Sequence, residues 1–93
     1  KDEEKDEVNI KDAENIIIVK SPIVGTFYRS PSPGSPPFVE KGSKVKKGDT
    51  LCIIEAMKLM NKINSEYDGV VEDIMVNNED AVEYDQAILK IRI

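Results

Sequence analysis

The sequence predicts an all-β domain, a flattened barrel of two four-stranded antiparallel sheets. No window of 11 residues sustains the 3.6-residue apolar stripe of a helix. Gly42, Gly48 and Gly69 separate short apolar runs, which is typical of strands joined by turns. Apolar residues also recur at a constant offset of 37 positions. The recurring pairs are Val39 and Val76, Val45 and Val82, Leu51 and Ile88, and Ile54 and Ile91.

The recurrence indicates two copies of one four-strand unit, related by a quasi-twofold axis. Gly25 recurs as Gly69 at an offset of 44, which is seven more than the offset of the later residues. Seven residues is about the length of a proline-rich segment in the first copy, so an insertion there explains both offsets. The second copy needs the first to bury its apolar face, so the two copies are expected to share one core.

Residues 1–15 differ from the rest of the chain in charge. They hold seven acidic residues and three lysines, and so account for a net charge of -4 out of the -5 of the whole chain. They have little apolar content and no helical stripe, which predicts a flexible acidic linker. The domain then spans residues 16–93.

The first strands are followed by a proline-rich loop. Ile16 to Ser21 is strand-like, and Gly25 to Tyr28 begins a second strand after a bend. Residues 30–37 hold four of the five prolines of the chain. Proline fixes φ and cannot donate a ladder hydrogen bond, so this segment is expected to be a stiff protruding loop. A linker between two domains is the alternative, but Phe27 and Phe38 on either side look like parts of one core.

A tight hairpin is expected in the middle of the chain. Two β-type runs, Thr50 to Ile54 and Lys62 to Asn64, have a separation that puts Met57 and Lys58 at the tip of the turn. A two-residue hairpin loop needs φ > 0 at both positions and favours Asn-Gly, whereas Met and Lys carry a Cβ that disfavours this region. Because Met and Lys go against the local preference here, we expect that these two residues are present for a functional reason.

The residue pattern of the last strand predicts whether the only cysteine is buried. Polar and apolar residues alternate in this strand, and the odd-numbered set is expected to face inward: Leu89, Ile91 and Ile93. The offset of 37 makes Cys52 and Ile54 the counterparts of Leu89 and Ile91. Cys52 is therefore expected to be a buried, inert core residue. A single cysteine forms no intrachain disulfide, which fits a reducing compartment.

Composition argues against an enzyme. The chain has no histidine, which is the usual proton shuttle near neutral pH and a common zinc ligand. With 93 residues, five aromatic residues and no Trp, it lacks the material for a deep catalytic pocket. We therefore expect no catalytic residue and no metal site, and a carrier or adaptor in place of an enzyme.

Charge and hydropathy argue against nucleic acid and membrane partners. Beyond residue 15 the chain carries about one net negative charge, which gives no electrostatic reason to bind phosphates. The longest apolar stretch, Ile16 to Val19, is far too short to span a bilayer. The chain does not begin with Met, so we expect a processed fragment without its targeting region.

The predicted tip has a recognisable sequence, Glu-Ala-Met-Lys-Leu-Met-Asn at residues 55–61. Together with the segments 25–31 and 48–54, it resembles the biotin carrier domain of multi-subunit acetyl-CoA carboxylase. The likeness extends from about residue 21 to residue 93. The usual signature is Glu-Ala-Met-Lys-Met, and Leu59 replaces the second Met with an apolar residue of similar volume.

The resemblance assigns roles to particular residues. It implies that Lys58 carries covalently attached biotin and that Met57 and Leu59 flank it on an exposed apolar tip. It also implies that residues 30–37 form the "thumb" of such carriers, with the Ser30 hydroxyl placed to reach the biotin ring. The roles of two neighbouring residues stay open. Glu55 is either a recognition charge or a solubilising one, and Met60 is either a tip residue or a core residue.

The resemblance also implies partners. A biotin protein ligase would attach biotin, a biotin carboxylase subunit would carboxylate it, and a carboxyltransferase subunit would use the carboxyl group in malonyl-CoA and fatty acid synthesis. The implied location is a bacterial cytoplasm or an organelle. Other readings stay open: a carrier of another biotin-dependent carboxylase or decarboxylase, a lipoyl domain, or an unmodified assembly adaptor in which Lys58 is incidental. Lipoyl domains commonly show Asp-Lys-Ala at the tip, which this chain lacks.

Overall fold

The structure, a computed structural model, describes residues 15–93, and these residues form eight strands and no helix. The predicted linker falls outside the described residues except for Asn15. The all-β prediction is confirmed for the described part of the chain. The strands are β1 (Ile16–Lys20), β2 (Gly25–Tyr28), β3 (Lys44–Val45), β4 (Thr50–Ala56), β5 (Leu59–Asn64), β6 (Gly69–Ile74), β7 (Ala81–Val82) and β8 (Ala87–Arg92).

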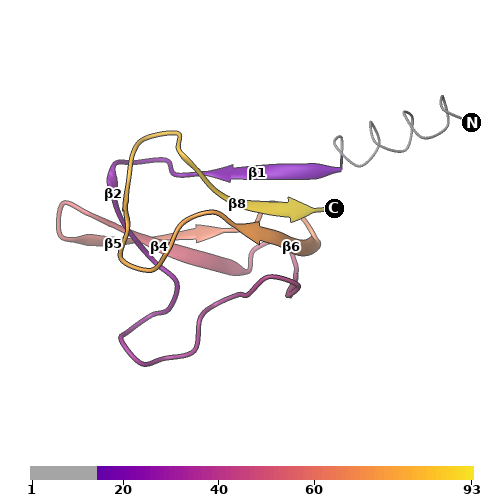
Figure 1. Ribbon diagram of the computed structural model, residues 1–93, viewed down its shortest axis with the longest axis horizontal. Coiled ribbons are helices and arrows are strands. Elements are labelled where there is room, and N and C mark those ends of the chain that lie inside the picture. The colour runs from indigo at the N-terminus through magenta and orange to yellow at the C-terminus, as the bar shows by residue number, and fades with distance from the viewer. Residues whose placement is uncertain (1–14) are drawn as a thin grey trace, which may run out of the picture.

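The strands form two antiparallel sheets of four, packed face to face (Figure 1). One sheet has the order β1-β8-β6-β3 and the other β5-β4-β2-β7. Each sheet therefore takes strands from both halves of the chain. The turn between β4 and β5 lies at one end of the sandwich, which we call the tip end. The start of β1 and the end of β8 lie at the opposite, far end (Figure 1).

Hydrogen bonds and turns confirm the predicted repeat. Ser21 and Ser65, which are 44 positions apart, are both buried, and each donates from Oγ to the carbonyl oxygen two residues later, at 2.6 Å. Left-handed turn positions recur at the offset of 37: Gly42 with Glu79, and Gly48 with Asp85. The quasi-twofold axis exchanges the two sheets, because β1, β8, β6 and β3 correspond to β5, β4, β2 and β7 in the same order.

Gly25 and Gly69 hold the same place in the two copies. A Cβ at Gly25 would clash with the carbonyl oxygen of Glu55, and a Cβ at Gly69 would clash with that of Arg92. Each glycine thus lets two neighbouring strands approach closely. Because both copies need a residue without a Cβ at this place, the glycine recurs, at the offset of 44 that relates β2 to β6.

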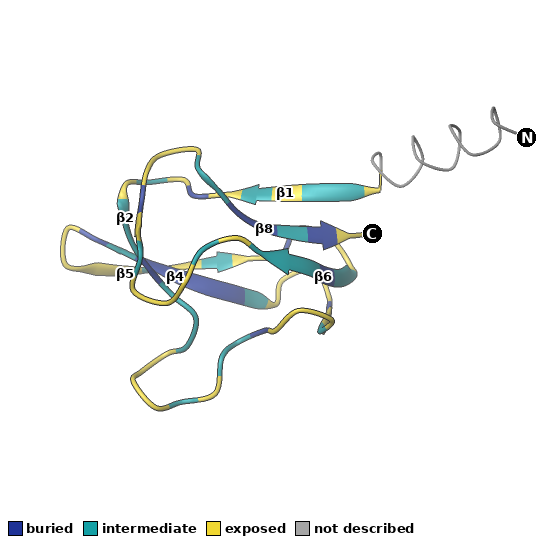
Figure 2. Cartoon of the chain, viewed as in Figure 1, coloured by how far each residue is buried: buried dark blue, intermediate teal, exposed yellow. Residues whose placement is uncertain are grey.

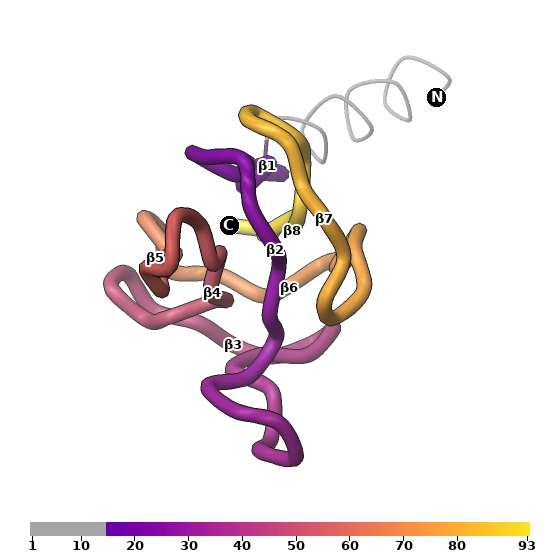
Figure 3. Tube along the Cα trace, turned by 90° about the vertical axis from the view of Figure 1, so that its left-hand side faces the viewer, coloured from indigo at the N-terminus to yellow at the C-terminus, as the bar shows by residue number. Residues whose placement is uncertain are grey.

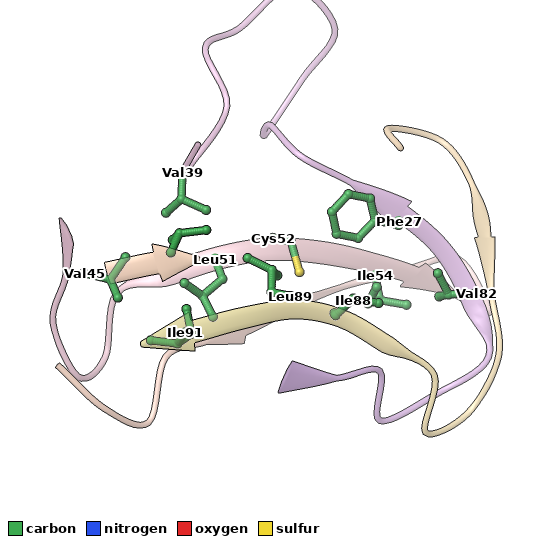
Figure 4. Packing of buried hydrophobic residues seen from close by; sticks show 11 residues of the cluster. Phe27, Val39, Val45, Leu51, Cys52, Ile54, Val82, Ile88, Leu89 and Ile91 are labelled. Carbon is green, nitrogen blue, oxygen red and sulfur yellow. The ribbon is translucent and has the colours of Figure 1, made fainter. Parts of the chain in front are cut away.

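The core fills the space between the two sheets (Figure 4). Figure 2 marks the buried residues along the strands. Of the eight residues in the predicted recurrence, seven are buried, and Val76 packs against them partly buried. The two copies therefore share one core, as expected. Its buried members are Phe27, Val39, Val45, Leu51, Cys52, Ile54, Val71, Val82, Ile88, Leu89 and Ile91.

The predicted inward face of the last strand was wrong at two positions. Ile88 is fully buried, although it is even-numbered, and Ile93 is 46% exposed. A bulge explains Ile88, because β1 pairs with Leu89 and then with Ala87 and skips the residue between them. A bulge interrupts the period of two, so two consecutive side chains can face the core. Ile93 lies beyond the end of β8, where the core has ended.

Cys52 is fully buried, as predicted, and burial raises the pKa of its thiol to about 12. Because the thiolate is the reactive form, we expect a thiol reagent at pH 8 to leave the native protein unlabelled. Labelling should become complete after unfolding in guanidinium chloride, and intact mass measures both states. A Tyr84→Cys variant, with an exposed second thiol, is the positive control. Rapid labelling of Cys52 in the native protein would contradict the strand register.

Candidate functional site

The β4–β5 hairpin closes at Met57 and Lys58, as predicted. Ala56 pairs with Leu59, so the loop between them holds two residues. Their φ angles are 54° and 66°, in the left-handed region that a type I′ turn requires. Such backbone costs of order 1–3 kcal/mol for each residue with a side chain, and the pairing of β4 with β5 holds it in place.

The tip is not the only place where the backbone is left-handed. Among the described residues other than glycine, Glu79 and Asp85 also have positive φ. A left-handed backbone at a residue with a side chain is therefore not by itself specific to the tip. Both of these residues lie in turns of the second copy, where the first copy has glycine at the corresponding positions.

The side chains of the tip project into solvent. Met57 is 87% exposed and Leu59 is 65% exposed. Lys58 is exposed as well, and no hydrogen bond or ion pair within residues 15–93 holds its ammonium group. Met60 is 53% exposed, so it belongs to the tip and not to the core. The tip is thus a lysine surrounded by apolar side chains.

Glu55 lies directly below the tip and accepts a hydrogen bond from the Tyr28 hydroxyl, with 3.0 Å between the oxygens. This hydrogen bond and the charge of Glu55 raise the pKa of Tyr28 above its ordinary value. The phenol therefore stays protonated at neutral pH and keeps donating. Neither role foreseen for Glu55 included this contact. The counterpart at the far end is an ion pair, in which Arg92 donates to both carboxylate oxygens of Glu72 at 3.0 Å.

Residues 30–37 form the protruding loop that the prolines predicted, and we call this loop the thumb (Figures 1 and 3). A hydrogen bond from the Phe38 N–H to the Arg29 carbonyl oxygen, at 2.8 Å, closes its base. Within it, the hydroxyl groups of Ser32 and Ser35 lie 2.7 Å apart. Internal hydrogen bonds therefore add to the stiffness that the prolines provide.

A cleft of about 240 Å³ lies between the thumb and the base of the hairpin. The Ser30 hydroxyl donates to the Ser32 carbonyl oxygen at 3.1 Å, so Ser30 offers the cleft its acceptor lone pairs. The predicted residue Ser30 therefore lies at this cleft, while Met57, Lys58 and Leu59 lie at the tip. The cleft is lined by residues 30–33 of the thumb, by Tyr28, Glu55 and Met60, and by Asn78 and Glu79.

Three of the cleft residues were not identified from the sequence. Tyr28 ends β2, and Asn78 and Glu79 belong to the turn between β6 and β7. The Arg29 N–H donates to Asn78 Oδ1 at 2.9 Å, which joins this turn to the base of the thumb. The repeat identifies Glu79 as the counterpart of Gly42. The thumb has no counterpart in the second copy, so the repeat does not predict which side chains of the second copy contact the thumb.

Within residues 15–93, no group of three or more His, Cys, Asp or Glu side chains is placed to hold a metal ion. No helix in this part of the chain is long and apolar enough to cross a membrane.

The fold and the site define a small carrier-type domain, a two-sheet sandwich that presents one lysine on a strained turn at its tip end. The chain belongs to the family described as biotin-requiring enzyme, whose model matches residues 18–91. The match includes both sheets and the turn that carries Lys58.

Curated relatives share about half of their aligned residues with this chain. It is 55% identical over 74 residues to the biotin carboxyl carrier protein of acetyl-CoA carboxylase of Haemophilus influenzae, and 57% identical over 74 residues to that of Pseudomonas aeruginosa. It is 53% identical over 74 residues to a chloroplastic carrier protein of the same name from Arabidopsis thaliana. Each alignment covers 80% of this chain but only 48%, 47% and 26% of the relative. The chain therefore spans about half the length of these relatives or less.

Solved structures show the same fold within much larger chains. Urea carboxylase of Kluyveromyces lactis matches with a TM-score of 0.70 and 29% identity, over 82% of this chain and 6% of that one. A single-chain, multi-domain long-chain acyl-CoA carboxylase matches with a TM-score of 0.71 over 84% of this chain and 7% of that one. Its identity is 15%, so this likeness shows the fold alone.

Proposed function

We propose that Lys58 is covalently biotinylated and that the domain carries a carboxyl group from biotin carboxylase to carboxyltransferase in acetyl-CoA carboxylase. The observation that carries the proposal is the position of Lys58, which is exposed on a strained two-residue turn within Ala-Met-Lys-Leu-Met. The relatives named biotin carboxyl carrier protein of acetyl-CoA carboxylase support both the cofactor and the enzyme system. The domain itself is non-catalytic in this proposal.

Attachment of biotin requires a separate enzyme. A biotin protein ligase activates biotin as its acyl-adenylate and takes a proton from Lys58. The Nζ lone pair then attacks the acyl carbon, a C–N bond forms, the bond from carbon to the phosphate oxygen breaks, and AMP leaves. The product is an amide, so the positive charge of Lys58 disappears.

The residues near the tip fit biotin. When bound, biotin supplies a ureido ring that takes up and releases a carboxyl group. The ring is neutral, with two N–H donors and one carbonyl acceptor. The cleft beside the thumb offers hydrogen-bond acceptors to such a ring: the Glu55 carboxylate, the Ser30 hydroxyl and the Asn78 side chain.

The fold suits a tethered carrier. Lys58 lies at the tip end, and β1 begins and β8 ends at the far end (Figure 1). The chain thus enters and leaves the domain away from the lysine, which leaves the tip open to a partner enzyme. Tethering raises the local concentration of the carried group at two active sites. Relatives from bacteria and chloroplasts support a place in a bacterial cytoplasm or an organelle.

Co-expression with a biotin protein ligase tests the proposal. We expect the intact mass to increase by one biotinyl group, and peptide mapping to place it on Lys58. A lipoyl adduct would favour the lipoyl reading, and an unmodified chain would favour the assembly adaptor. Either result contradicts the proposal.

A further inference from the structure

One sheet carries exposed apolar residues at the tip end of every strand. Across the sheet order β5-β4-β2-β7, these are Leu59 at the start of β5, Met57 at the turn after β4, Val24 just before β2 and Tyr84 in the turn after β7. Their exposed fractions are 65%, 87%, 63% and 70%. We call these four residues the apolar row.

Strand pairing places the members of the row next to one another. Thr26 of β2 pairs with Glu55 of β4, so Val24, two residues earlier on the chain, comes level with Met57. On its other side β2 pairs with the last residue of β7, which places Val24 beside the turn that carries Tyr84. Figure 3 looks at this end of the molecule and shows the β4–β5 turn, the β1–β2 connection and the β7–β8 turn together.

The far end of the molecule provides an internal comparison. The repeat relates Val24 to Asp68 and Tyr84 to Lys47, at the offsets of 44 and 37. Both counterparts are exposed, and the Lys47 N–H donates to Asp68 Oδ1 at 2.8 Å. The same arrangement of strands therefore forms with charged residues at these places. The fold does not require Val24 and Tyr84 to be apolar, and exposed apolar residues that a fold does not need mark an interaction surface.

Acidic residues surround the row. Glu83 and Asp85 flank Tyr84, and Glu55 lies below the tip. Lys20 lies 3.8 Å from Asp85, and Lys58 stays charged until an amide forms, so three carboxylates face two ammonium groups. A complementary partner would therefore offer an apolar pocket surrounded by basic side chains.

We propose that the apolar row is the docking surface for the enzyme that biotinylates Lys58, and that this enzyme binds it with an apolar pocket ringed by basic side chains. The inference rests on the proposed function. The enzyme has to bring Lys58 Nζ into its own active site, and the lysine side chain is short, so the enzyme must cover the residues beside the turn. Enzymes that act on biotin reach it at the end of a longer arm and do not have to cover the row.

A double swap tests the proposal. Val24→Asp with Tyr84→Lys installs the far-end side chains at the tip end without changing the net charge. Asp68→Val with Lys47→Tyr is the reciprocal control at the far end. With purified ligase, biotin and ATP, we expect the tip-end swap to lower kcat/KM for the domain at least tenfold, mainly through KM, and the far-end swap to leave it unchanged. Added NaCl should raise KM for the unaltered domain, because salt screens the acidic rim.

Binding without reaction gives a second readout. A Lys58→Arg domain cannot be biotinylated, so calorimetry with the ligase should show binding that the tip-end swap abolishes. Thermal unfolding checks that both double variants keep the fold, which is expected because all four positions are exposed. Equal kcat/KM for the unaltered domain and the tip-end swap would overturn the proposal, as would an equal loss in the far-end swap. Failure of the proposed function looks different, because then Lys58 of the unaltered domain is not biotinylated at all.

Discussion

Replacing Lys58 by arginine is expected to abolish biotin incorporation completely and to leave the fold intact. The arginine side chain stays protonated, so it cannot supply the neutral amine that attacks the activated acyl group. Arginine has the same Cβ at the left-handed turn position and keeps the positive charge. Because the position is exposed, we expect the free energy of unfolding to change by less than about 0.5 kcal/mol. Streptavidin blotting and intact mass measure the incorporated biotin, and thermal unfolding measures the stability.

Lys62 provides the matched control. It is also exposed and lies four residues further along, but it sits in strand β5 without a left-handed backbone or the apolar tip. Lys62→Arg should retain one biotin for each chain. Biotin on the Lys58→Arg variant, mapped to any other lysine, would show that the ligase does not select this turn.

Much of the fold could be predicted because the sequence repeats it. The offset of 37 identifies core positions in both copies, such as Leu51 and Ile88, without any knowledge of their contacts. Gly25 and Gly69 mark the places where strands approach closely, because a neighbouring carbonyl group leaves no room for the Cβ of any other residue. The tip was identifiable because Met57 and Lys58 oppose the preference of a two-residue loop.

The remaining features depend on contacts between strands, which no local pattern encodes. The bulge that turns Ile88 inward arises from its pairing with β1, so the period of two in the sequence gives the wrong answer for it. The hydrogen bond between Tyr28 and Glu55 joins residues 27 positions apart. The apolar row becomes visible only when the sheet order places Val24 between Met57 and Tyr84.

The structure indicates that the thumb can be removed without loss of the fold. Residues 30–37 include no buried residue and contribute no member of the core cluster. Their ends already meet, because the Phe38 N–H donates to the Arg29 carbonyl oxygen at 2.8 Å. The second copy connects the corresponding strands without such an insertion. Replacing residues 30–37 by Asn-Gly, a pair suited to a two-residue turn, should therefore leave a folded domain.

Function should nevertheless fall when the thumb is removed. The shortened domain lacks one wall of the cleft that Glu55 and Met60 also line, so the biotin ring should lose its contacts with the protein. A rigid loop holds a group at a lower cost in entropy than a mobile one, and without it the ring samples many unproductive positions. We expect biotinylation by the ligase to continue at the unaltered rate, and acetyl-CoA carboxylation in the assembled system to fall about tenfold, a difference of about 1.4 kcal/mol.

NMR should show contacts between the ring and Ser30 only while the thumb is present. A thumb of equal length made of Gly and Ser separates stiffness from bulk, and should give an intermediate rate. Unchanged carboxylation in the deletion variant, with a freely tumbling ring in the unaltered domain, would show that the thumb is a passive insertion.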